Sequence, residues 1–169
     1  LLSFIVRTLN LKALDPNLPK EFEDTFDNKK YLKSQEYTRA NSQFSYITAT
    51  FSLIVSLVFI FGIPQFEISP LYNEIDLLVR SYSYGSIITG LIFFAYLTLI
   101  TDLLNTPFGL YRTFVIEEKF GFNKTTLSTY LGDKVKGYFL MTLLGAPLIS
   151  LTLYFFDTFD AYAWLFAWI

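Results

Sequence analysis

The chain contains neither histidine nor cysteine among its 169 residues. Zinc sites built on imidazole or thiolate ligands are therefore excluded within it. Ser-His and Cys-His nucleophile pairs are excluded too, because each needs a side chain that the chain lacks. Without cysteine no disulfide framework constrains the fold. What remains for chemistry is a set of fifteen carboxylates together with Lys, Tyr, Ser and Thr.

Charged residues are also scarce, at 17% of the chain, whereas hydrophobic residues make up 53% and aromatic residues 20%. The mean hydropathy of +0.41 is too apolar for an ordinary soluble domain and indicates a membrane protein. Nineteen Phe and twelve Tyr residues suit lipid-facing and interfacial surfaces. With a net charge of −2, nothing in the composition suggests nucleic acid as a partner.

Three long apolar runs are candidates for membrane spans. They cover residues 44–63, 84–104 and 137–156, and the only charge among them is Asp102, near the end of the second run. About 20 helical residues cross the roughly 30 Å hydrocarbon core of a bilayer. We therefore predict an all-α integral-membrane fold, a polytopic helical bundle with three complete spans.

Two shorter apolar runs, residues 1–6 and 161–169, are interpreted as parts of two further spans at the ends of the chain. Five passes follow, three complete and two partial. Residue 1 is Leu and the only Met is Met141, so we expect the chain to be a fragment of a longer protein.

Helix boundaries between the spans follow from capping and breaking residues. Residues 21–40 contain no Pro or Gly and are expected to form one or two surface helices. The string Asn105-Thr106-Pro107 predicts a helix restart with Pro107 at the first helical position, which gives an interfacial extension over residues 107–120. Thr125 or Thr126 can cap the helix that leads into the third run.

Basic residues predict the orientation of these passes. Of the thirteen Lys and Arg residues, six lie in residues 10–43 and five in residues 105–136, whereas residues 65–83 contain only Arg80. By the positive-inside rule, residues 10–43 and 105–136 face the cytoplasm. The membrane is then a bacterial inner membrane or the endoplasmic reticulum.

A short polar and aromatic connection, residues 113–123, is the least loop-like part of the polar sequence. Its first half is typical of a helix and its second half of a helix end. Gly121 fits the left-handed position just after a helix, and Phe122 can fold back onto Ile116. Glu117 and Glu118 point about 100° apart on a helix, so they cannot act as a facing carboxylate pair. The simplest interpretation is that Glu117 and Glu118 are surface charges.

Asp102 is the one charge inside a predicted span. A charge in a membrane segment is costly and often faces a cavity or a partner. Since Asp102 lies within about one turn of the interface, it can also reach water or Arg112. Both interpretations stay open.

Three strings carry a resemblance to a known family. Residues 110–126, Leu-Tyr-Arg-Thr-Phe-Val-Ile-Glu-Glu-Lys-Phe-Gly-Phe-Asn-Lys-Thr-Thr, closely resemble the N-terminal membrane region of integral-membrane zinc metalloproteases of the CAAX prenyl endopeptidase type. Residues 33–37, Lys-Ser-Gln-Glu-Tyr, resemble the family's Lys-Ser-Arg-x-Tyr segment, with Gln35 in place of the usual Arg. Residues 162–166 resemble the start of the family's next span.

The resemblance implies that residues 1–169 form an N-terminal membrane domain and that a catalytic zinc domain follows beyond residue 169. In the family, a His-Glu-x-x-His helix and a later Glu hold the zinc, and the motif Glu activates water. This chain has no such motif. We therefore expect no cofactor and no activity in this part alone, with zinc and cleavage of a peptide or prenylated peptide substrate implied for the full-length parent.

The resemblance also implies partners and site residues. The partners are the lipid bilayer and the catalytic portion of the same protein. The connection at 113–123 would help to build the wall of the catalytic chamber from the cytoplasmic side. The candidates for this chamber wall or domain contact are Glu117, Glu118, Gly121, Phe122 and Asn123.

Two other classes of function stay open. The chain can be a polytopic scaffold or transporter module, in which Asp102 and the helix at 137–156 are elements of a pathway. It can also be a chaperone-like or substrate-gathering membrane domain with no chemistry of its own. A His-Glu-x-x-His motif beyond Ile169 would decide for the protease.

The predicted topology can be tested by cysteine scanning, since the chain contains no cysteine of its own. An impermeant thiol reagent should label cysteines placed in residues 65–83 from the side opposite to those placed in residues 10–43. Labelling of both segments from the same side would contradict the topology.

Overall fold

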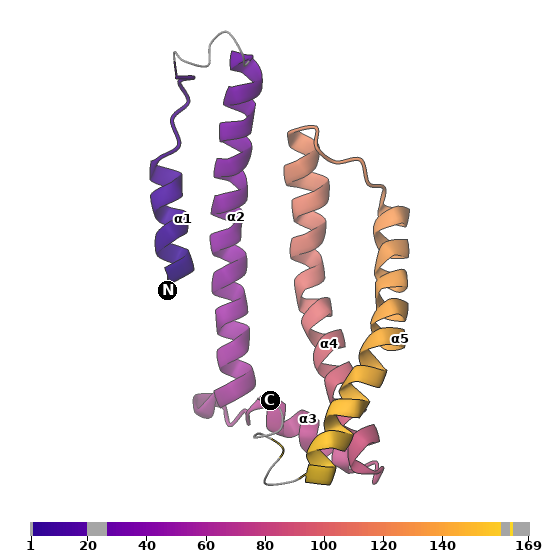
Figure 1. Ribbon diagram of the computed structural model, residues 1–169. Coiled ribbons are helices and arrows are strands. Elements are labelled where there is room, and N and C mark those ends of the chain that lie inside the picture. Colours follow the sequence, from indigo (N-terminus) through magenta and orange to yellow (C-terminus); the bar gives the residue numbers. More distant parts are fainter. Residues whose placement is uncertain (1, 20–26, 160–162, 164–169) are drawn as a thin grey trace. The chain divides into compact units, whose positions relative to one another are not determined.

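The computed structural model describes residues 2–19, 27–159 and 163, and these residues fold as helices joined by short connections (Figure 1). In chain order the α-helices are α1 (Leu2–Lys12), α2 (Asn28–Phe61), α3 (Leu71–Arg80), α4 (Ser86–Tyr111) and α5 (Leu127–Phe159). A 3-10 turn, Pro64–Phe66, follows α2, and a π-helical segment, Arg112–Glu117, continues α4. The predicted all-α fold is confirmed.

Three of these helices are long and apolar enough to cross a membrane. They are α2, α4 together with its π-helical continuation to Glu117, and α5. Each covers all or nearly all of one of the three apolar runs found in the sequence, so the three complete spans are confirmed. Of the run at 161–169 only Ala163 is described, so that predicted partial span lies almost entirely outside the described residues.

The polar stretch before the first complete span does not form a separate surface helix. Helix α2 begins at Asn28 and runs without interruption into the apolar run, because no Pro or Gly occurs between Asn28 and Phe61. Asp27 caps its first turn, since its Oδ1 accepts a hydrogen bond from the backbone N–H of Lys29 at 2.8 Å. With 34 residues, α2 is about 50 Å long, well beyond the thickness of the hydrocarbon core.

The predicted helix restart at Pro107 is wrong, because Pro107 lies inside a continuous α4. An internal proline removes one backbone hydrogen bond, whereas a chain break would leave several backbone groups unpaired. In an apolar environment, losing one backbone hydrogen bond costs less free energy than leaving several backbone groups unpaired. Pro147 is likewise inside α5, and Figure 1 shows α5 changing direction partway along its length.

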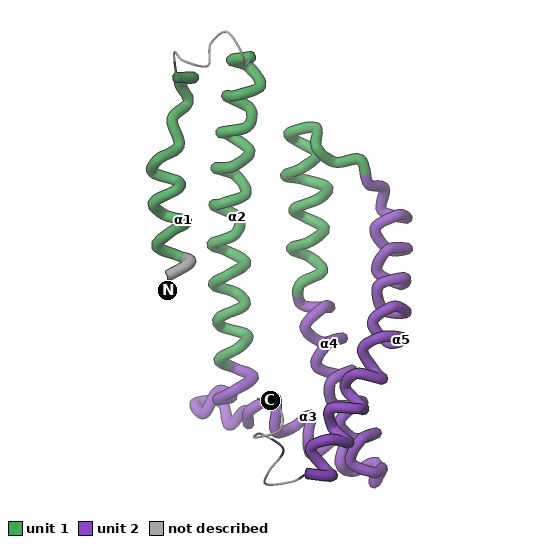
Figure 2. The backbone as a smooth tube through the Cα atoms, in the orientation of Figure 1, with its two compact units in different colours: residues 1–57, 105–124 green, residues 58–104, 125–169 purple. Residues whose placement is uncertain are grey.

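The chain divides into two compact units, shown in Figure 2. Unit 1 comprises Leu1–Leu57 and Asn105–Lys124. Aromatic rings hold it together, because Phe108 lies 4.8 Å from Phe51 and 6.2 Å from Phe44 between ring centroids. Near α1, the hydroxyls of Thr8 and Tyr46 are hydrogen bonded at 2.8 Å.

Unit 2 comprises Val58–Leu104 and Thr125–Ile169. Its buried side chains include Ile75 and Val79 on α3 and Phe59 near the end of α2. Tyr72 of α3 packs on Phe59, with ring centroids 5.3 Å apart. The hydroxyl of Ser86 donates a hydrogen bond to the Asp157 carboxylate, which joins the start of α4 to the end of α5.

Most large apolar side chains of α5 are exposed. Examples with more than three-fifths of their surface exposed are Val135, Phe139, Leu144, Leu148 and Leu151. A soluble helix would bury such a face against a core. Here lipid is the solvent that these side chains require.

Gly62 ends α2 with a left-handed backbone, φ +67°, and sits against the returning chain. A Cβ at this position would lie 2.7 Å from the Ser69 carbonyl carbon and 2.9 Å from the Pro70 nitrogen. We expect Gly62→Ala to destabilise the protein by about 1–3 kcal/mol, from backbone strain and steric overlap. Thermal unfolding in detergent should show a lower Tm. Gly132→Ala is the control, because a Cβ there meets no atom within 4 Å, and an unchanged Tm for Gly62→Ala would contradict the expectation.

Candidate functional site: the α4–α5 connection and the Asp102 cluster

The connection between α4 and α5 opens with a π-helical segment, Arg112–Glu117. Such segments are rare and occur often at functional sites. The segment buries Ile116, and Phe120, which follows it, is buried too. The sequence correctly predicted a helix here but gave no signal of its π-helical form.

The helix closes at Gly121, as predicted. Gly121 has φ +68°. Its N–H donates to the carbonyl of Glu118 at 2.9 Å, and the N–H of Phe122 donates to the carbonyl of Glu117 at 2.8 Å. These two bonds form a Schellman motif, which satisfies carbonyl groups that the helix end would otherwise leave unpaired.

The closed end of this helix packs on α2 within unit 1. The ring of Tyr37 lies 5.5 Å from that of Phe120 and 4.7 Å from that of Phe122, between centroids. The ammonium of Lys33 lies 6.0 Å from the centre of the Phe122 ring, a cation–π distance. The connection therefore contacts residues 33–37, the second string that carries the family resemblance.

The polar candidates of the connection are only partly brought together. The Asn123 side-chain amide donates to the Glu118 carboxylate at 2.9 Å. Glu117 is half-buried and lies next to Glu118 in the chain. The side-chain oxygen of Gln35 is buried without a hydrogen-bond partner in the described part of the chain. Gln35 is the position where the family segment has Arg, and its burial could not be read from the sequence.

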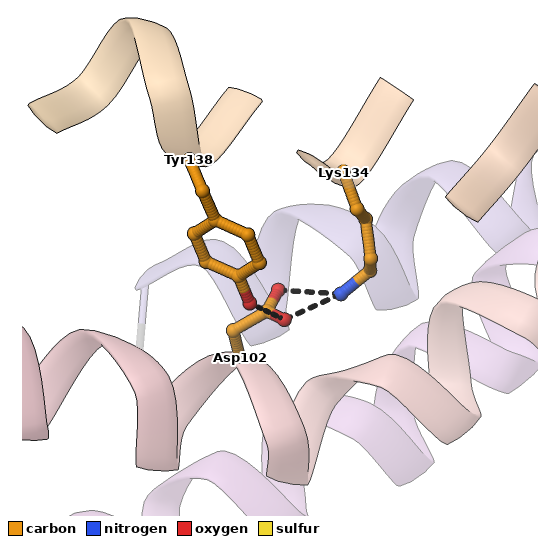
Figure 3. A network of polar contacts seen from close by, with 3 residues as sticks. All are labelled: Asp102, Lys134 and Tyr138. Carbon is orange, nitrogen blue, oxygen red and sulfur yellow. Dashed lines mark hydrogen bonds and ion pairs between the residues drawn. The ribbon is translucent and has the colours of Figure 1, made fainter. Parts of the chain in front are cut away.

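Asp102 lies in a cluster with Lys134 and Tyr138 of α5 (Figure 3). The Lys134 ammonium donates to both carboxylate oxygens, at 2.7 and 2.5 Å, and the Tyr138 hydroxyl donates to one of them. Lys134 and Tyr138 are four residues apart, so they share one face of α5. The Asp102 side chain is 36% exposed and that of Lys134 22%, so the charges neutralise each other in a partly water-excluded place.

Asp102 thus pairs across to α5 and not with Arg112 along its own helix. The Arg112 Nε donates instead to the side-chain oxygen of Asn41 at 3.2 Å. A signal for the Lys134 pairing was present in the sequence. Two consecutive spans joined by a short connection run antiparallel, which brings the end of one toward the start of the next. A carboxylate near the end of α4 and a Lys-x-x-x-Tyr string near the start of α5 then lie at similar depth.

The described residues contain no group of three or more His, Cys, Asp or Glu side chains that could hold a metal ion. The helices and contacts described above define an all-helical integral-membrane domain. Residues 7–169 match the sequence model of the family described as CAAX prenyl protease N-terminal, five membrane helices. The chain belongs to this family. The family's five helices agree with the five predicted passes.

Individual relatives agree with the family match. The chain is 33% identical to CAAX prenyl protease 1 of Saccharomyces cerevisiae over 156 residues, which cover 88% of this chain and 33% of that protein. It is 37% identical to probable CAAX prenyl protease 1 of Schizosaccharomyces pombe, covering 86% of this chain and 33% of that protein. The crystal structure of S. mikatae Ste24p superposes with a TM-score of 0.81 at 27% identity, covering 98% of this chain and 39% of that one. The chain spans about a third of the length of these curated relatives.

The Asp102–Lys134 pair should stabilise the association of α4 with α5. Because breaking a buried pair leaves an uncompensated charge, we expect Asp102→Leu and Lys134→Met each to cost roughly 1–3 kcal/mol, less than for a fully buried pair. The double variant should lose less than the sum, since it leaves no lone charge. Thermal unfolding of the three variants in detergent measures the coupling.

The exposed pair Asp133–Lys136 on α5 provides the control. Its side chains are 63% and 77% exposed, so Asp133→Asn should change stability by about 0.5 kcal/mol or less. Strictly additive effects of the two substitutions in the Asp102–Lys134 pair would show that the pair does not couple the helices.

Proposed function

We propose that this chain is the membrane-embedded N-terminal part of a zinc metalloendopeptidase of the CAAX prenyl protease type. In this role it scaffolds the catalytic chamber and the access of substrate to it. The observation that carries the proposal is the family match over residues 7–169. The backbone similarity to S. mikatae Ste24p over nearly the whole chain supports it.

The zinc of such an enzyme does not fit the residues of this chain. Borderline-soft Zn²⁺ is bound by His, Cys and carboxylate side chains, and the chain has no His or Cys. The zinc ion would therefore be held by the portion of the protein that the longer relatives possess and this chain does not cover. We propose that residues 1–169 act as the N-terminal membrane domain that positions that portion.

We further propose that residues 10–43 and 105–136 face the cytoplasm. The distribution of basic residues motivates this orientation. Contacts inside unit 1 support a common side for the two segments, because Arg112 bonds Asn41 and Tyr37 packs on Phe120. In unit 2 the Ser86–Asp157 hydrogen bond supports a common side for the α3–α4 turn and the end of α5.

The α4–α5 connection would serve the enzyme through its shape. Its helix end is fixed by the Schellman motif at Gly121 and by the rings of Tyr37, Phe120 and Phe122. The Glu118 carboxylate accepts a hydrogen bond from Asn123, which ties the chain after the helix back to its last turn. A surface fixed in this way can form part of a chamber wall or contact the catalytic portion. It contains no facing pair of carboxylates for proton transfer.

Two substitutions in the full-length protein test this role. Gly121→Val should lower peptide cleavage several-fold, because a β-branched residue at φ +68° costs about 1 kcal/mol or more and displaces the Phe122 packing. Glu118→Gln should keep most of the activity, since an amide preserves the shape and can still accept from Asn123. Cleavage is assayed at matched expression and zinc content.

Gly132→Val is the matched control for the glycine substitution, because an added Cβ there meets no atom within 4 Å. Loss of turnover in Glu118→Gln, with zinc content and folding unchanged, would mean that this carboxylate takes part in the chemistry. Full activity in Gly121→Val would contradict the proposal that peptide cleavage depends on the shape of this helix end.

A further inference from the structure

Unit 2 contains a cavity lined by residues outside the Asp102 cluster. It has a volume of about 560 Å³ and lies among α3, the turn that follows it, the start of α4 and the end of α5. This volume falls within the usual range for small-molecule sites, about 300–1,000 Å³. All of its lining residues belong to unit 2.

The lining of the cavity has two chemical halves. One half is apolar and consists of Phe93, Phe94 and Leu153. The other half is polar and carries charges of both signs, with Asp76 and Arg80 from α3 and Ser86 at the start of α4. An occupant that matches both halves is amphiphilic.

Local structure fixes the polar half. Val79 is completely buried, which anchors α3 one residue before Arg80. The turn after α3 is closed by hydrogen bonds from the Tyr82 N–H to the Val79 carbonyl at 3.2 Å and from the Ser83 N–H to the Arg80 carbonyl at 3.0 Å. Ser83 has φ +58°, a strained conformation for a residue with a Cβ. This turn positions Tyr84 at the rim of the cavity.

A close helix contact forms part of the apolar half. Gly90 of α4 faces Leu153 of α5, and a Cβ at Gly90 would lie 2.5 Å from a Leu153 methyl carbon. The missing side chain lets the two helices approach closely beside the cavity. The apolar wall is therefore continuous from α4 to α5.

The charges at the rim favour a ligand that itself carries both a positive and a negative charge. Arg80 donates from Nε to Asp76 at 2.7 Å, and this hydrogen bond raises the pKa of the guanidinium. Its two terminal amino groups remain available for an anion, because the described residues give Arg80 this one partner. Asp157 accepts a hydrogen bond from the lining residue Ser86, so its carboxylate lies next to the cavity. With two carboxylates and one guanidinium, a purely anionic headgroup would meet a net charge of −1.

The position of the cavity brings it to the surface of the membrane. It lies where α4 begins and α5 ends, and both are candidate spans. Tyr84 lines the cavity and its ring lies 6.4 Å from that of Tyr82, and tyrosines are enriched at membrane interfaces. Lipid headgroups are therefore the most concentrated amphiphiles that can reach it.

We propose that this cavity binds one zwitterionic phospholipid, with its phosphate against Arg80, its ammonium group toward Asp76 and Asp157, and an acyl chain along Phe93, Phe94 and Leu153. Arg donates well to phosphate oxygens, and carboxylates with a neighbouring Tyr ring suit an alkylammonium group. The site belongs wholly to unit 2. It does not depend on peptidase activity.

Native mass spectrometry of the full-length protein tests the site, with palmitoyl-oleoyl phosphatidylcholine and the corresponding phosphatidylglycerol as probes. The wild type should retain one phosphatidylcholine at least fivefold more strongly than phosphatidylglycerol. Arg80→Gln, which removes the phosphate partner, and Thr89→Phe, which fills the cavity, should each reduce that retention about fivefold or more.

Lys136→Gln is the control, because it removes an exposed cation that lies in an ion pair on α5 outside the cavity. Its phosphatidylcholine retention should equal that of the wild type. Equal retention in Arg80→Gln would overturn the proposal, and so would wild-type retention of phosphatidylglycerol as strong as that of phosphatidylcholine. If Thr89→Phe fails to fold by circular dichroism, Arg80→Gln decides, since its side chain is 68% exposed and its loss should be tolerated.

Discussion

Every backbone N–H and C=O inside a bilayer must find a partner within the protein, because the hydrocarbon offers none. This constraint explains why α2, α4 and α5 each continue as single long helices. It also explains why proline at 107 and 147 lies inside helices without ending them, since each costs one bond where a break would cost several. The irregular backbone is left to the short connections, where Gly62 and Gly121 adopt left-handed conformations.

Side-chain interactions then hold the helices of each unit together without a large buried core. In unit 1 the contacts are between aromatic rings. Phe108 packs on Phe44 and Phe51, and Tyr37 packs on Phe120 at the helix end closed by Gly121. In unit 2 polar contacts join α4 to α5, through Asp102 with Lys134 and Ser86 with Asp157. Lipid does not compete for such polar contacts as water does, so a few of them can fix the position of a helix.

The sequence predicted the spans, the left-handed Gly121 and a cap at Thr126, whose hydroxyl accepts from the Thr129 N–H at 3.2 Å. These features depend on composition or on residues close in the chain. It failed at Pro107, where a local breaker signal was weaker than the demand for continuous hydrogen bonding in an apolar environment. The aromatic partner of Phe122 comes from another helix, and local patterns do not specify such a contact. The pairing of Asp102 with Lys134 has a signal in the sequence, but only when the two antiparallel spans are considered together. The roles of Glu117, Glu118 and Asn123 in the parent protein remain predictions.

The π-helical segment at Arg112–Glu117 has a consequence for how sequences of this kind can change length. A wider turn accommodates one more residue than an α-helical turn over the same rise. Removing a single residue from this stretch would let it become an ordinary α-helix, and the side chains that follow would keep their directions around the axis. Phe120 would still point toward Tyr37. The stretch is therefore a place where a related sequence can gain or lose one residue without turning the side chains that follow it.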